Sequence, residues 1–200
     1  LGTVEFLVDK NEKIYFMEVN PRVQVEHTIT EELTGIDLIR AQINVFCGLS
    51  IQDQNLTEVN IIGKRASIQA RLNMESYDKK IQLVPATGTI KEYDIASGPG
   101  IRVDGAGKVG FKNDGLYDSL LAKVIATSDL GLSEAVRKLN FTLRMSKISG
   151  VETNKNLIIA VLNQENLESG SVNISSIDKK IKEYLQKLRI KSQEKEIKDK

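Results

Sequence analysis

The chain has 200 residues, of which 40% are hydrophobic and 28% are charged, and its formal net charge is +1 at neutral pH. This length allows one or two domains with a sizeable core, and the near-zero charge argues against a nucleic-acid-binding surface. The apolar stretches are far too short to span a membrane, and the single cysteine, Cys47, excludes an internal disulfide. Because no signal peptide is visible, we expect a cytoplasmic protein, with Cys47 in its core.

A β-hairpin is the first element that the pattern predicts. Apolar and polar residues alternate through residues 4–8 and again through 14–20, which is the periodicity of strands. The polar stretch 9–13 between them is rich in turn-forming residues. If Asp9 pairs with Ile14 across this turn, the register of both strands follows.

In that register Glu5 faces Glu18, and Asn20 lies on the same face of the hairpin. Two like charges directly opposite each other destabilise a sheet, whereas a cation between them makes the pair favourable. Oxygen ligands of this kind suit Mg²⁺ or Mn²⁺, which bridge to substrate phosphates. The alternative is an exposed face with solvated glutamates, since a one-residue slip in register would separate the pair.

The segment after the hairpin carries a second group of polar side chains. Pro21 favours an extended chain here, in which Arg22, Gln24 and Glu26 continue the face of the hairpin carboxylates. Arg22 presents a planar fork that matches a small anion, Gln24 can donate to the same anion, and Glu26 beside it can act as a base. For each residue the alternative is a surface salt bridge, and the only histidine, His27, is given no role.

Two helical segments are expected next. Thr28 and Glu31 have the spacing of a capping box that opens a helix. Gly35 interrupts the helical pattern, and Asp37 can cap its continuation. Gly48 is a good terminator for this second segment.

The chain beyond the polar connection at residues 50–60 is β-rich at first and helical later. The candidate strands are Ile61–Leu72, Gly88–Tyr93, Gly100–Val103 and Leu120–Thr127. The candidate helices are Ser133–Met145, capped by Ser133, and Lys155–Asn163. From Lys179 to Lys200 nine Lys or Arg residues stand against four Asp or Glu residues, which favours a solvated terminal helix that frays into a disordered end. The pattern predicts an α+β fold.

The run Glu18-Val19-Asn20-Pro21-Arg22 resembles the terminal metal-binding motif of ATP-grasp ligases, and alone it would also suit carbamoyl phosphate synthetase. Its extension Val23-Gln24-Val25-Glu26-His27 is similar to biotin carboxylase, the ATP-dependent component of biotin-dependent carboxylases. Further landmarks follow in the family's order: Ser67–Arg71, Gly88–Ile90, Gly98–Arg102, Tyr117–Lys123 and Gly150–Asn154. The resemblance covers residues 1 to about 175 and is strongest to pyruvate carboxylase.

The resemblance implies binding roles for the first two groups of residues. Glu5, Glu18 and Asn20 match the family's metal ligands, and Glu18 also matches an ATP-binding position. The bicarbonate site is matched by Arg22, Gln24, Val25 and Glu26, with Val25 contributing through its backbone. The implied cofactor is Mg²⁺ or Mn²⁺, with two ions expected.

The resemblance also implies catalytic roles for Glu26, Arg22 and Arg102. Glu26 matches the proposed general base that deprotonates bicarbonate before its attack on ATP. Arg102 matches the arginine that binds biotin and stabilises its enolate while the enolate attacks CO₂. Without the resemblance, Arg102 would be interpreted as a strand-end arginine paired on the surface.

The implied organisation is the end of an ATP-grasp domain over residues 1–55, a β-rich biotin carboxylase C-terminal domain with packed helices over 56–175, and a charged tail over 176–200. The family's upstream nucleotide-binding lysines and glycine-rich loop have no counterpart here, so we expect a carboxy-terminal fragment that is inactive alone. Two alternatives stay open: another ATP-grasp ligase, such as carbamoyl phosphate synthetase, and a non-catalytic dimerisation module.

The implied partners follow from the same family. They are a biotin carboxyl carrier domain or protein, a carboxyltransferase component and a second copy of the chain in a homodimer. The carboxyltransferase selects the final acceptor, which is pyruvate or an acyl-CoA, and no nucleic acid or membrane is implied.

Overall fold

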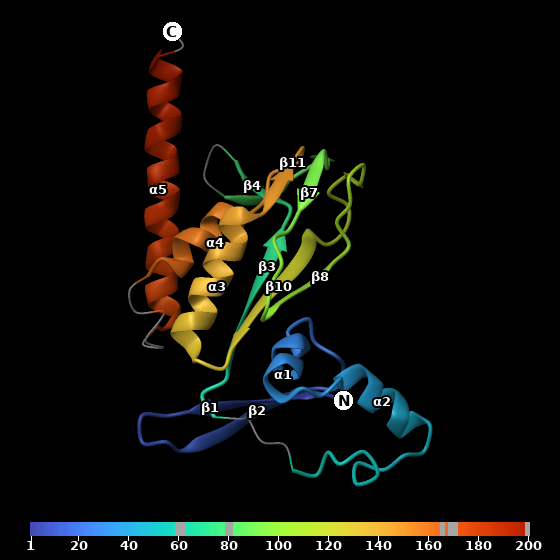
Figure 1. The fold of residues 1–200 in the computed structure, drawn as a ribbon. Helices are drawn as coiled ribbons and strands as arrows, with labels where there is room; N and C mark the ends of the chain where they lie inside the picture. Colours follow the sequence, from blue (N-terminus) through green and yellow to red (C-terminus); the bar gives the residue numbers. More distant parts are fainter. Residues whose placement is uncertain (59–62, 79–81, 165–166, 168–171, 199–200) are drawn as a thin grey trace. The chain divides into compact units, whose positions relative to one another are not determined.

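The computed structural model of the protein describes residues 1–58, 63–78, 82–164, 167 and 172–198. These residues form two compact units, unit 1 over Leu1–Lys64 and unit 2 over Arg65–Lys200 (Figure 1). The mixture of helices and small antiparallel sheets confirms the predicted α+β class. No helix within the described ranges is both long and apolar enough to cross a membrane.

Unit 1 contains one hairpin and two short helices. These elements are β1 (Thr3–Val8), β2 (Ile14–Asn20), α1 (His27–Thr34) and α2 (Leu38–Phe46). The predicted interruption is confirmed, because Gly35 ends α1 with φ +73°, a conformation that glycine adopts at little cost. Asp37 caps α2 as predicted, since its carboxylate accepts the backbone N–H of Arg40 at 2.8 Å. Cys47 is exposed, so its predicted core position is wrong.

The predicted register of the hairpin is confirmed at its open end. Glu5 pairs with Glu18, and Thr3 pairs with Asn20. Because side chains alternate between the faces of a strand, Glu5, Glu18 and Asn20 project from one face. The hairpin therefore gathers the three expected metal ligands.

Toward the turn the predicted register is wrong by one residue. Ile14 pairs with Val8 rather than with Asp9. The Asp9 carboxylate accepts the backbone N–H of Lys13 at 2.9 Å, and this bond holds Asp9 inside the loop. Met17 is the extra residue of a β-bulge, because Phe6 pairs with Phe16 whereas Glu5 pairs with Glu18. The bulge therefore restores the predicted register at the open end of the hairpin.

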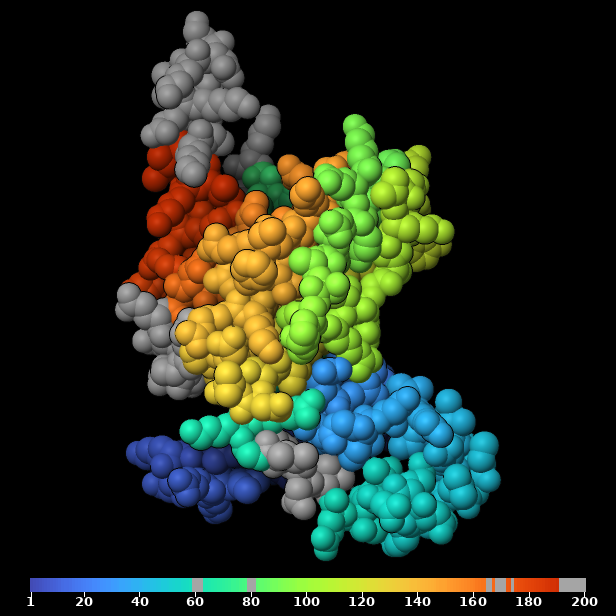
Figure 2. Space-filling view, viewed as in Figure 1, coloured from blue at the N-terminus to red at the C-terminus, as the bar shows by residue number. Residues whose placement is uncertain are grey.

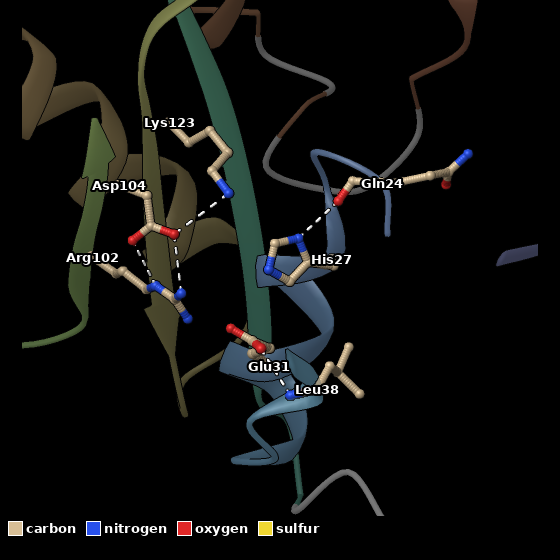
Figure 3. Close-up of polar contacts among 7 residues, drawn as sticks. All are labelled: Gln24, His27, Glu31, Leu38, Arg102, Asp104 and Lys123. Atoms are coloured by element: carbon tan, nitrogen blue, oxygen red, sulfur yellow. Dashed lines mark hydrogen bonds and ion pairs between the residues drawn. The ribbon is translucent and has the colours of Figure 1, made fainter. Parts of the chain in front are cut away.

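The predicted extended arm after β2 is also wrong. The chain bends at Arg22, whose backbone N–H donates to the carbonyl of Asn20 at 2.8 Å. Glu26 is already helical, with φ −79° and ψ −4°, and stands at the N-cap of α1. The carbonyl of Gln24 accepts the ring Nδ1–H of His27 at 2.7 Å (Figure 3). This bond turns the chain into the helix and gives His27 a structural role.

The predicted capping box does not form. Helix α1 begins at His27, its N-cap Glu26 makes no side-chain cap, and Thr28 lies inside the helix. Glu31 instead accepts the backbone N–H of Leu38 at 2.9 Å (Figure 3). Glu31 therefore satisfies a donor at the start of α2.

Unit 2 is built on a three-stranded antiparallel sheet with the order β3-β10-β8. The strands are β3 (Ala66–Asn73), β10 (Leu120–Ser128) and β8 (Ile101–Gly105). Helix α3 (Leu132–Met145) packs on one face of the sheet (Figure 1). The core between them includes Leu72, Val124 and Leu139, all fully buried.

The other face of this sheet carries polar side chains. Lys123 of β10 lies between Asp104 of β8 and Arg71 of β3 in the register. Two residues further along β10, Ile125 pairs with Arg102 of β8 on one side and with Gln69 of β3 on the other. The period of two along each strand thus separates an apolar core face from a charged face.

Smaller elements complete unit 2 around the sheet. Three short pairs form: β4 (Glu75–Tyr77) with β5 (Leu83–Pro85), β6 (Gly88–Thr89) with β9 (Lys112–Asn113), and β7 (Glu92–Asp94) with β11 (Lys147–Ser149). Helix α4 (Lys155–Leu162) packs on α3, and α5 (Ile174–Lys198) packs on α4. Figure 2 shows α3 and α4, in yellow to orange, on the same visible face of unit 2 as the light-green segment that contains β7 and β8.

Asn154, the last residue of the Gly150–Asn154 landmark, has a structural role. Its amide accepts the backbone N–H of Asn73 at 3.0 Å and donates to the carbonyl of Arg71 at 3.1 Å. The amide therefore pairs with the edge of β3 in place of another strand.

The predicted elements of unit 2 are confirmed in kind but not in all bounds. The start of the predicted strand Ile61–Leu72 lies outside the described residues, and Gly88–Tyr93 is divided between β6 and β7. Helix α3 has Gly131 rather than Ser133 as its N-cap residue. The predicted terminal helix is confirmed by α5, but the helix continues to Lys198, where the sequence predicts a disordered end.

Candidate functional site

The three expected metal ligands are joined by hydrogen bonds. The amide nitrogen of Asn20 donates to Glu5 Oε1 at 2.9 Å and to Glu18 Oε1 at 3.2 Å. Glu5 and Asn20 are half-buried, whereas Glu18 is exposed. The amide donor reduces the repulsion between the paired carboxylates, which explains how the hairpin holds them face to face.

This donor set fits a hard divalent cation. Carboxylate and amide oxygens are ligands that Mg²⁺ and Mn²⁺ accept, and a half-turn of the Asn20 amide exchanges its nitrogen for its oxygen. Across the described ranges, no group of three or more His, Cys, Asp or Glu side chains is placed to hold a metal. A site at Glu5, Glu18 and Asn20 would therefore also need oxygens from water or substrate.

The expected bicarbonate residues lie on the bend and turn between β2 and α1. Arg22 is exposed, and its Nη1 donates to the carbonyl of Val23 at 3.2 Å. Gln24 and Val25 are half-buried, and Glu26 is exposed at the N-cap of α1. These residues follow Asn20 in the chain, and the backbone N–H of Arg22 donates to the Asn20 carbonyl at 2.8 Å, so Arg22 begins beside the expected metal ligands.

Arg102 belongs to unit 2 and is held by the carboxylate of Asp104, which no sequence motif indicated. Its Nε donates to Asp104 Oδ1 at 2.9 Å, and its Nη2 donates to Asp104 Oδ2 at 3.0 Å (Figure 3). Lys123 Nζ lies 3.4 Å from Asp104 Oδ2. Alternation along β8 could have placed Asp104 beside Arg102, but Lys123 joins them only through the pairing of β8 with β10.

Asp104 makes the stability of the chain depend on pH. The hydrogen bonds from Arg102 hold the pKa of the Asp104 carboxyl below its ordinary value, against the effect of burial, and Lys123 lowers this pKa further. Such a group contributes stability above its unfolded-state pKa of about 4, and this stability is lost as the pH falls through the folded-state pKa. We expect the unfolding free energy to fall more steeply below about pH 4 in the wild type than in Asp104→Asn. Urea unfolding at a series of pH values measures this, and parallel curves would contradict it.

Comparisons with known proteins cover both units. The family profile described as the biotin carboxylase C-terminal domain matches residues 69–179. The profile described as the ATP-binding domain of the carbamoyl-phosphate synthase L chain matches residues 1–54. The mitochondrial pyruvate carboxylase of Mus musculus is 43% identical over 178 residues, which are 88% of this chain and 15% of that protein.

Two solved structures extend the similarity to the fold. A single-chain, multi-domain long-chain acyl-CoA carboxylase superimposes with a TM-score of 0.84 and 38% identity, over 92% of this chain and 20% of its own. The biotin carboxylase domain of Hydrogenobacter thermophilus 2-oxoglutarate carboxylase gives a TM-score of 0.76 and 34% identity, over 89% of this chain and 38% of its own.

The matches cover most of this chain but only part of each relative. The chain spans 15% of the length of the mouse relative, so the activity of a whole carboxylase is not transferred by similarity alone. The biotin carboxylase profile, however, covers more than half of the chain, and the resemblance to pyruvate carboxylase is confirmed by the mouse sequence. The chain belongs to the biotin carboxylase family.

Proposed function

We propose that this chain provides the metal, bicarbonate and biotin residues of a biotin carboxylase, which uses ATP and bicarbonate to carboxylate biotin on a carrier. In this proposal residues 1–55 end the ATP-grasp domain, 56–175 form the C-terminal domain, and 176–200 are an appended tail. The observation that carries the proposal is the Asn20 amide bonded to both Glu5 and Glu18. The description of the Hydrogenobacter structure, which names MgADP and bicarbonate, supports the same substrates for this chain.

The side chains of unit 1 suit the first step of this reaction. The Arg22 guanidinium, the Gln24 amide and the backbone of Val25 bind bicarbonate. The Glu26 carboxylate accepts the bicarbonate proton, so that the resulting oxygen attacks the γ-phosphorus of ATP and ADP leaves. The product is carboxyphosphate. A cation at Glu5, Glu18 and Asn20 would neutralise charge on the phosphate oxygens.

Arg102 suits the second step. Carboxyphosphate breaks down to CO₂ and phosphate, and the phosphate accepts the N1′ proton of biotin. The enolate that forms carries negative charge, which the Arg102 guanidinium stabilises while the N1′ nitrogen attacks CO₂. We propose the carrier, a carboxyltransferase and a second copy of the chain as partners. The description of the Hydrogenobacter structure names a dimer and supports the last of these. The cytoplasmic location stays a prediction, since the mouse relative is mitochondrial.

Biotin dependence tests the proposed function. The assay protein is a chimaera in which this chain replaces the matching segment of a pyruvate carboxylase, because we expect residues 1–200 alone to release no phosphate from ATP. Biotin-stimulated, bicarbonate-dependent phosphate release by the chimaera supports the proposal. Turnover indifferent to biotin would favour another ATP-grasp ligase, such as one that makes carbamoyl phosphate, and a folded but inactive chimaera would favour a dimerisation module.

Glu18→Gln is expected to weaken Mn²⁺ binding by the ADP-bound chimaera. The substitution keeps the shape of the side chain but removes one of the two hairpin charges, so we expect a loss of about 10-fold or more in affinity. An electron paramagnetic resonance titration of free Mn²⁺ measures the affinity. Glu12→Gln, in the hairpin turn, is the matched control, and equal affinities in the two variants would exclude Glu18 as a ligand.

A further inference from the structure

The Arg102 side chain is held at two points by one carboxylate. Its Nε and Nη2 groups donate to the two oxygens of Asp104 at 2.9 and 3.0 Å (Figure 3). A guanidinium is a planar fork, so two parallel bonds to one carboxylate define both its plane and its rotation. Each remaining N–H group of Arg102 therefore has a defined direction.

Asp104 is held in turn by a neighbouring strand. Asp104 and Lys123 are directly paired between β8 and β10, and Lys123 Nζ lies 3.4 Å from Asp104 Oδ2. The Lys123 side chain is only 11% exposed, and a lysine this buried is stabilised by a carboxylate partner. Asp104 therefore contacts both cations, Arg102 through two hydrogen bonds and Lys123 through one ion pair.

The backbone that carries Arg102 is also fixed to β10. The backbone N–H of Thr127 donates to the carbonyl of Gly100 at 2.7 Å. Lys138 Nζ reaches the carbonyls of Pro99 at 3.4 Å and Thr127 at 3.3 Å, and so joins the turn before β8 to the end of β10. The strand position and the guanidinium orientation of Arg102 are therefore set by separate contacts.

We propose that Asp104 is a positioning residue that orients Arg102 for the biotin enolate, and that Lys123 holds Asp104 for this purpose. This inference rests on the proposed function. Fixing the guanidinium before substrate binds means that its charge is in place when the enolate forms. Asp104 itself acts through Arg102 and not on the substrate.

A double-mutant cycle in the chimaera tests this role. Asp104→Asn preserves the side-chain size but replaces one acceptor with a donor that opposes the guanidinium, so biotin-stimulated turnover is expected to fall about 10- to 100-fold. The KM values for ATP and bicarbonate should not change, because Asp104 is assigned to neither substrate and the proposed bicarbonate residues lie in unit 1. In an Arg102→Gln background, Asp104→Asn should cause no further loss. Asp104→Glu, which keeps the charge, should recover part of the activity.

The control variant removes a different carboxylate of unit 2. Asp129→Asn removes an 82%-exposed carboxylate that lies 3.7 Å from Arg65 and should leave turnover unchanged. In the 200-residue chain, the Arg102 Nε–H nuclear magnetic resonance signal should be protected from exchange in the wild type and exposed in Asp104→Asn. Additive losses in the cycle, or wild-type turnover in Asp104→Asn, would overturn the positioning role of Asp104 but would leave the proposed function standing. A wild-type chimaera without biotin-stimulated turnover would instead contradict the proposed function.

Discussion

Glu26→Gln is expected to reduce bicarbonate-dependent ATP cleavage by the chimaera roughly 10³-fold, which is within the range of general-base catalysis. The amide has the shape of the carboxylate but cannot accept the bicarbonate proton. The side chain stands at the exposed N-cap of α1, where its backbone carbonyl accepts the N–H of Ile29 at 3.0 Å. This backbone contact does not depend on the carboxylate, so the helix should form in the variant. Initial rates of phosphate release measure the effect.

The control for this prediction is another exposed glutamate of unit 1. Glu12→Gln removes the same charge from the hairpin turn, where the residue has φ +61°, and should leave the rate unchanged. The KM for ATP should be similar in both variants, since Glu26 is assigned to bicarbonate. Equal rates in Glu26→Gln and Glu12→Gln would show that Glu26 is not the base.

Gly150→Ala is expected to destabilise the chain by about 3 kcal/mol, which combines the cost of a left-handed backbone with that of overpacking. Gly150 has φ +88°, and an added Cβ would collide with the Thr89 carbonyl oxygen and lie 2.7 Å from the backbone nitrogen of Lys91. Both neighbours are backbone atoms of the segment that contains β6, so they cannot move aside as a flexible side chain can. Urea unfolding of the 200-residue chain measures the loss.

Gly110 separates the two parts of this effect. Its φ is +86°, close to that of Gly150, but an added Cβ would have no atom within 4 Å. Gly110→Ala should therefore cost only about 1 kcal/mol, the backbone part alone. If the two alanine variants lose the same stability, the close packing of Gly150 contributes nothing.

The Glu5–Glu18 pair shows why the hairpin was partly predictable from sequence. Alternation in both strands placed the carboxylates on one face, and the observed pair agrees. The side chain of Asp9, however, bonds to the backbone of Lys13 and keeps Asp9 in the loop, which shifts the strand register by one residue. The bulge at Met17 reverses this shift. Strand periodicity contains neither feature, because both depend on local turn geometry.

The remaining differences arise from contacts between distant parts of the chain. Glu31 bonds to Leu38 at the start of α2, and α1 begins before Thr28, although the spacing of Thr28 and Glu31 suits a capping box. Asp104 and Lys123 were not selected because their contact depends on the register of β8 with β10. Arg102 itself was found only through the family resemblance, since its pattern alone indicates a surface arginine.

The most direct test of the biotin carboxylase assignment follows labelled carbon. The chimaera is supplied with ATP, Mg²⁺, free biotin and ¹⁴C-bicarbonate, and the carboxybiotin formed is counted after unreacted CO₂ is removed. Our assignment predicts label on biotin that requires ATP and is lost in Glu26→Gln. ATP cleavage without label on biotin would contradict it and would assign the chain to another ATP-dependent reaction.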